Sequence, residues 1–135
     1  MYQRYHLSHT DALKIIVAIQ VELEKDNKGA AVAIVDAQGE LIAFLRTDGC
    51  RLPSITTAMN KAFTAAREQK ESKAIGQSSR EKQFPMTNFG DLRYTAWGGG
   101  VPIIYNGQVV GAVGVSGLPE EKDMVLAQRG AGLIS

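Results

Sequence analysis

The histidines are the first side chains in this sequence that could do chemistry. His9 stands between Ser8 and Asp11, and His6 lies three residues before it. Neighbours this close at the start of a helix cannot adopt the geometry of a Ser-His-Asp triad. Ser8 and Asp11 instead predict a helix cap. The H-x-x-H spacing suits a shared metal, but His6 precedes the expected helix and no third ligand is evident, so we predict no metal site. His9 remains a candidate axial ligand for an iron porphyrin.

A second group of chemical interest follows an expected strand. Arg46, Asp48 and Arg51 surround Gly49, and Lys61 lies two turns into the next expected helix, among alanines. An arginine, a lysine and a glycine-rich loop together could bind an anion. Lys61 could equally reach the surface or pair with Asp48, and the whole group could be a structural ion-pair cluster. The sequence leaves these alternatives open.

Composition excludes several classes of function. The 15 Lys and Arg residues against 14 Asp and Glu give a net charge of +1, which argues against a nucleic-acid binder. Cys50 is the only cysteine, so neither an intrachain disulfide nor a cysteine-based zinc site can form. The glycines of Gly98–Gly100 lack the spacing of a phosphate-binding loop, which argues against ATP or NAD. No stretch reads as a bilayer-spanning helix or a secretory signal, so we expect a cytoplasmic protein with no membrane partner.

These residues must be positioned by a small set of helices and hairpins. With 135 residues, 44% of them hydrophobic, the chain is expected to form one domain over residues 1–135. Helical periodicity predicts helices over residues 8–27, 53–69 and 119–130, and a short one within 71–83. Hairpins are predicted over residues 30–45 and 101–115, the second around Asn106-Gly107. Residues 84–100 read as a long loop, a kind that is often functional.

The order of these elements predicts an antiparallel sheet with helices on both faces. The strand segments are apolar throughout rather than alternating, so both faces of the sheet need cover. Glycines at 111, 114 and 117 indicate places where something packs closely against the backbone.

Five sequence blocks resemble the GlcG/HbpS-like family, which includes the C-terminal domain of PduO-type corrinoid adenosyltransferases. The similarity covers nearly the whole chain, and Asp123 and Ala127 fit the pattern of the family's last helix. The blocks are VDAQG at 35–39, RTDG at 46–49, AMNKAFTA at 58–65, GGVPI at 99–103 and GQVVGAVGVSG at 107–117.

The resemblance implies a profilin-like α-β-α sandwich around a five-stranded antiparallel sheet. The residues alone suggest four strands, and the fifth is expected near residues 92–96. The resemblance also implies homo-oligomers, haem binding in some members, and operons for glycolate, diol or glycerol metabolism.

Three functions remain open from the sequence. We expect first a non-catalytic module that binds a small ligand, with haem or another tetrapyrrole as the candidate cofactor. The alternatives are an enzyme or cobalamin-enzyme accessory acting on a small carboxylate or aldehyde, and a homo-oligomeric assembly subunit. The lack of a paired base and nucleophile argues against an enzyme. The predicted ligand-binding residues are Arg46, Asp48, Lys61, Trp97, Gly99, Gly100 and Ser116.

Overall fold

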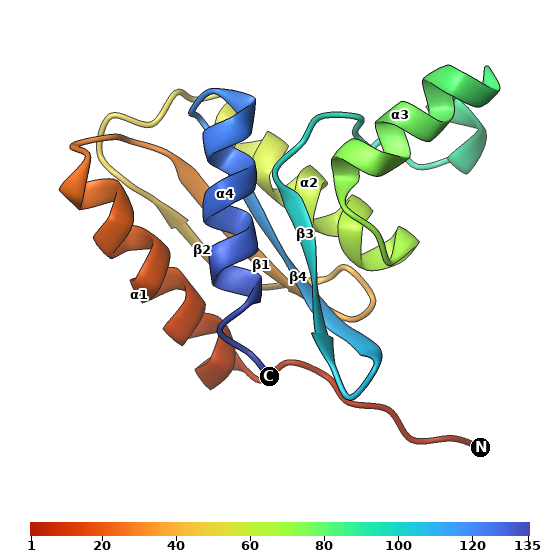
Figure 1. Ribbon diagram of the computed structural model, residues 1–135, viewed down its shortest axis with the longest axis horizontal. Helices are drawn as coiled ribbons and strands as arrows, with labels where there is room; N and C mark the ends of the chain where they lie inside the picture. The colour runs from red at the N-terminus through yellow and green to blue at the C-terminus, as the bar shows by residue number, and fades with distance from the viewer.

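The computed structural model describes residues 1–135 and places four helices around one sheet. A 3₁₀ turn at Met86–Phe89 lies between α3 and β3. None of the helices has the length and apolarity needed to cross a bilayer. The chain order is α1 His9–Lys25, β1 Ala31–Asp36, β2 Leu41–Arg46, α2 Ser54–Glu68, α3 Ser72–Lys82, β3 Gly100–Tyr105, β4 Gln108–Ser116 and α4 Glu120–Ala131 (Figure 1).

Local signals in the sequence account for several of these boundaries. The Ser8 hydroxyl accepts a hydrogen bond from the backbone N–H of Asp11, and the Asp11 carboxylate accepts one from the backbone of Ser8, so the predicted cap is confirmed. Asn106 and Gly107 both have positive φ, of 50° and 73°, as the tightest hairpin turn requires. Gly76 does not end α3, because the missing side chain lets the helix pack against Ala96.

The sheet has four strands in the order β2-β1-β4-β3, and every pair is antiparallel. The predicted fifth strand near residues 92–96 is wrong. In that segment the backbone N–H groups of Arg93 and Thr95 donate to side-chain oxygens of Asp91 and Thr64 rather than to a neighbouring strand. Tyr94 stacks on Phe89, with ring centroids 4.1 Å apart, so aromatic packing holds the segment as a loop.

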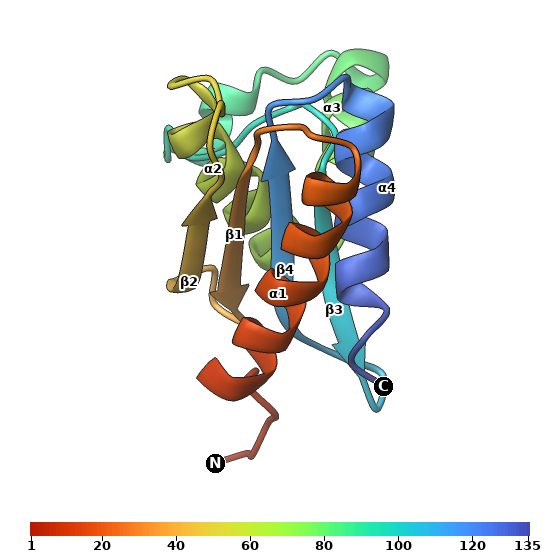
Figure 2. The same ribbon diagram turned by 90° about the vertical axis from the view of Figure 1, so that its left-hand side faces the viewer.

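The two faces of the sheet are covered by different kinds of side chain. Val32 and Ile34 of β1 face α1 and α4, where large aliphatic side chains fill the core. Ala31 and Ala33 face α2, in a layer made mostly of alanine. The predicted sandwich is therefore present, with α1 and α4 on one face and α2 on the other (Figure 2).

Small residues bring α2 unusually close to the sheet. A Cβ at Gly114 of β4 would overlap the carbonyl oxygen of Ala58, and one at Gly100 of β3 would overlap the carbonyl oxygen of Lys61. The predicted close approach at Gly114 is confirmed. This approach fixes the height of α2 above β4, and with it the position of Lys61.

We expect Gly114→Ala to destabilise the fold strongly, because the added methyl group meets backbone atoms that cannot rotate away. Overpacking of this kind costs about 1–3 kcal/mol or more. The matched control is Gly132→Ala at the end of α4, where the new Cβ would lie 3.4 Å from the Gln128 carbonyl oxygen. The control should change the free energy of unfolding by less than about 0.5 kcal/mol. Urea denaturation measures both, and similar values for the two variants would contradict this packing.

Candidate functional site

A polar cleft of about 620 Å³ opens where the first turns of α2 and α4 meet the end of β4. Trp97 and Leu118 are its only large apolar lining residues. The remaining lining residues are Arg51, Pro53, Ser54, Thr57, Lys61, Gly98, Ser116, Gly117, Pro119, Glu120 and Asp123. Segments far apart in the sequence therefore build one site.

A buried ion pair forms the floor of this cleft. Lys61 is 3% exposed and Asp123 is 2% exposed, and Lys61 Nζ lies 3.2 Å from Asp123 Oδ2. The same Nζ donates to the Val115 carbonyl oxygen at 2.9 Å, and Asp123 Oδ1 accepts from the backbone N–H of Leu118 at 3.1 Å. Burial raises the pKa of Asp123, against the opposing effects of the Lys61 charge and these hydrogen bonds.

Two charged residues of the predicted anion-binding group lie outside the cleft. Arg46, at the end of the edge strand β2, and Asp48 are both exposed, and neither lines the cleft. Asp48 lines a separate hollow together with Lys122. Lys61 pairs with Asp123 rather than Asp48, because α2 carries it toward the opposite side of the β4–α4 loop. Ligand binding by Arg46 and Asp48 thus stays a prediction without a place in the cleft.

The glycines at the start of β3, Gly99 and Gly100, pack against Lys61. A Cβ at Gly99 would lie 3.0 Å from Lys61 Nζ, and one at Gly100 would overlap the Lys61 carbonyl. The buried Ser72 hydroxyl holds this segment, because it donates to the Trp97 carbonyl oxygen and accepts from the Gly100 N–H. Gly99 and Gly100 therefore position Lys61, while Trp97 lies exposed on the rim and Ser116 lines the cleft.

Sequence reasoning missed three groups at this site, Asp123, Ser54 and Glu120. Glu120 accepts hydrogen bonds from the Gly98 backbone and from Lys73, and these interactions lower its pKa. The predicted anion site rested on residues near in sequence. Only the packing of α2 and α4 at one end of the sheet brings Ser54 and Glu120 together.

A second hollow, which we call the aromatic groove, lies between the N-terminal segment and the C-terminal residues. It has a volume of about 460 Å³, and 6 of its 10 lining residues are hydrophobic. The rings of Tyr5 and Tyr105 meet edge to face at 5.0 Å. The lining residues are Tyr5, His6, Leu7, Asp11, Lys14, Tyr105, Val110, Leu133, Ile134 and Ser135.

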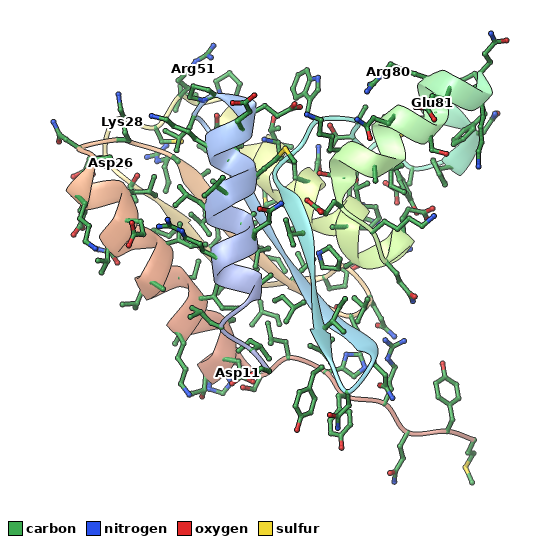
Figure 3. All side chains as sticks on the ribbon, viewed as in Figure 1. Asp11, Asp26, Lys28, Arg51, Arg80 and Glu81 are labelled. Carbon is green, nitrogen blue, oxygen red and sulfur yellow. The ribbon has the colours of Figure 1, made fainter.

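The two hollows lie at opposite ends of the molecule. Figure 3 places Arg51 at the end where α4 begins, and Asp11 at the other end, where α1 begins. His9, two residues before Asp11, is exposed and lines neither hollow. His9 therefore cannot reach a ligand held in the polar cleft of the same chain.

Neither hollow contains an assembled catalytic or metal-binding group. The structure holds no cluster of three or more His, Cys, Asp or Glu side chains that could bind a metal ion. Both histidines lie at the far end from Ser54 and Ser116, so no imidazole is placed to activate these hydroxyls. The arrangement can bind and orient a ligand.

Comparison with known proteins gives one consistent family. The family model described as "Haem degrading protein HbpS-like" matches residues 7–132. Protein GlcG of Escherichia coli (strain K12) is 36% identical over 110 residues, which are 82% of this chain and 81% of that protein. A crystal structure of a double mutant of HbpS from Streptomyces reticuli has a TM-score of 0.89 at 29% identity, and covers 100% of this chain and 91% of that chain. A crystal structure of a PduOC:heme complex has a TM-score of 0.88 at 24% identity and covers 96% of each chain, which shows a shared fold.

The ion pair on the floor of the cleft gives a test by mutation. We expect Lys61→Met to cost about 3–5 kcal/mol of unfolding free energy, because it leaves the Asp123 carboxylate buried without a partner. Adding Asp123→Leu should recover much of that loss, since no unpaired charge then remains. The control is Lys73→Met, whose partly exposed pair with Glu120 should contribute less than about 1 kcal/mol. Additive losses in the double variant, measured by urea denaturation, would show that the two groups do not interact.

Proposed function

This chain belongs to the HbpS-like family, and on that premise we propose that it is a non-catalytic module that binds haem or another tetrapyrrole. Support comes from the family's description and from the PduOC:heme complex, which has the same fold. In this proposal the protein is cytoplasmic and is an accessory to the metabolism of glycolate, diols or glycerol, as the family resemblance implies.

The aromatic groove is the place that best fits a porphyrin. A tetrapyrrole ring is large and apolar, and sites for such ligands are lined mainly by hydrophobic and aromatic side chains. The groove offers such walls, with an imidazole at His6 and the cation of Lys14 for a propionate. The polar cleft has only two hydrophobic residues among the 13 that line it. The presence of His6 in the lining of an aromatic groove is the observation that carries this proposal.

The two histidines of the chain differ in their position relative to the groove. His6 lines the groove, whereas His9 stands exposed in the first turn of α1. We therefore assign the axial role to His6 and retain His9 as the competing ligand.

An enzyme that uses Lys61 as a nucleophile or base has less support. Such chemistry needs a free amine lone pair. Here Lys61 Nζ donates to both the Val115 carbonyl oxygen and the Asp123 carboxylate, as a buried ammonium would. An enzyme acting on a small carboxylate or aldehyde therefore ranks below a binding module.

A haemin titration of the purified protein tests the proposed function. We expect a shifted Soret band that saturates at a fixed ratio of haemin to subunit. His6→Ala should abolish the shifted band, because the iron loses its axial ligand, while His9→Ala should retain it. Loss of the band only in His9→Ala would move the ligand to that residue. A linear titration without a new band would exclude haem as the ligand.

A homo-oligomeric assembly subunit is the second candidate, and one observation favours it. Leu13, Val17 and Val21 recur every four residues along α1 and are all exposed. An apolar stripe at this spacing lies on one face of a helix and is typical of surfaces that bind another protein. The stripe and haem binding are compatible, because the stripe lies on a face of α1 that does not line the aromatic groove.

Sedimentation of charge variants tests this assembly. We expect the wild-type chain to sediment as an oligomer at micromolar concentration, and Leu13→Glu/Val17→Glu to shift it toward monomer, because carboxylates in an apolar interface lose their hydration. The control is Leu92→Glu, an exposed leucine in the 84–97 loop away from α1. A monomeric wild-type chain, or equal effects of both changes, would contradict assembly through α1.

A further inference from the structure

In the polar cleft, the carboxylate acceptors have hydrogen-bond partners within the protein, whereas several donors do not. Asp123 and Glu120 supply its acidic groups, and each of their four oxygens already accepts a hydrogen bond within the protein. Both carboxylates are therefore already engaged as acceptors within the protein.

Several donors of the cleft, in contrast, have no partner. Ser54 is 7% exposed and Ser116 is 6% exposed, and neither hydroxyl makes a hydrogen bond within the protein. Lys61 Nζ uses two of its three N–H groups, on the Val115 carbonyl oxygen and on Asp123. These three groups border the cleft with hydrogen-bonding positions that the protein leaves open, which suits a ligand rich in acceptors.

The charges around the cleft limit what that ligand can be. Lys61 and Arg51 line it, and Lys73 pairs with Glu120 at its rim, against the two carboxylates of Asp123 and Glu120. Three cations against two anions leave room for a single negative charge. A doubly charged ligand such as phosphate would be repelled by the neighbouring carboxylates.

The free donors also converge from separate elements. Ser54 and Lys61 are seven residues apart on α2 and so lie on the same face, about 10.5 Å apart along its axis. The side chain of Lys61 leans back toward the start of the helix, as side chains on helices do, which shortens that distance. Ser116, at the end of β4, borders the same floor, whereas Arg51 stands at the rim, where Figure 3 shows its side chain reaching outward.

We propose that the polar cleft binds a small monocarboxylate that carries a further oxygen on the carbon next to the carboxylate, as in a 2-hydroxy or 2-oxo acid. The Arg51 guanidinium makes no ion pair in the protein, and once its side chain turns in from the rim it can take both carboxylate oxygens at once. Ser54, Ser116 and the third N–H of Lys61 then bind the additional oxygen. This site is separate from the aromatic groove, so it goes beyond the proposed haem binding and can fail or succeed independently of it.

Amide and indole NMR shifts with four matched probes test the proposal. Lactate has both the carboxylate and the neighbouring hydroxyl, propionate lacks the hydroxyl, and propane-1,2-diol lacks the carboxylate, while inorganic phosphate carries the larger charge. We expect lactate to shift the signals of Gly117, Leu118 and the Trp97 indole, and to bind more tightly than each of the other three. No response in these signals, or equal or tighter binding of any of the other probes, would overturn the proposal.

Variants then assign the two parts of the ligand to their partners. Ser54→Ala/Ser116→Ala should weaken lactate binding about tenfold, because it removes two hydrogen bonds to the hydroxyl oxygen, and should reduce the preference for lactate over propionate by the same factor. Arg51→Gln should weaken the binding of both acids alike.

Ser78→Ala, on α3 outside the cleft, is the matched control, and unchanged melting temperatures show that each variant is folded. A serine variant that prefers lactate over propionate as strongly as the wild-type chain does would overturn the assignment. Haemin binding by the same serine variant should be unchanged, which separates this test from that of the proposed function.

Discussion

The buried pair between Lys61 and Asp123 is the constraint on which the rest of this structure depends. Removing two charges from water is costly unless the charges meet each other and their remaining hydrogen-bonding groups are filled. Here the pair meets at 3.2 Å, with the end of β4 supplying a carbonyl to the lysine and the Leu118 N–H to the aspartate. It joins α2 on one face of the sheet to α4 on the other, and so fixes how the two layers meet at the mouth of the cleft.

The packing of the alanine-rich layer makes this pair possible. Glycines on β3 and β4 let the backbone of α2 approach the sheet so closely that a lysine two turns along the helix reaches the end of β4. On the opposite face, large aliphatic side chains fill the space between the strands and α1 and α4. The two layers therefore differ in their contribution. The layer of α1 and α4 supplies most of the apolar core, and the α2 layer positions charged and polar groups.

Local patterns in the sequence were sufficient to predict most elements of the fold. The Ser8–Asp11 cap, the Asn106-Gly107 turn and the glycine at 114 each depend on neighbouring residues or on backbone geometry, and each is confirmed. The family resemblance is also confirmed by the match over residues 7–132. The fifth strand was wrong because the aromatic contacts of Tyr94 and the side-chain hydrogen bonds around it replace a ladder, and these depend on residues distant in sequence. The same limit applies to the site, where Lys61 could be singled out but its partner, 62 residues away, could not.

Two hollows lie at opposite ends of one small fold, and the pair between Lys61 and Asp123 forms the floor of one of them. This pair holds the Lys61 side chain in place at the floor of the cleft. NMR observation of lysine side-chain nitrogens tests it most directly. We expect Lys61 to give an ammonium signal whose protons exchange slowly with water, and to lose that protection in Asp123→Asn. Exchange as fast as that of the surface lysines, or protection that survives Asp123→Asn, would contradict this view of the site.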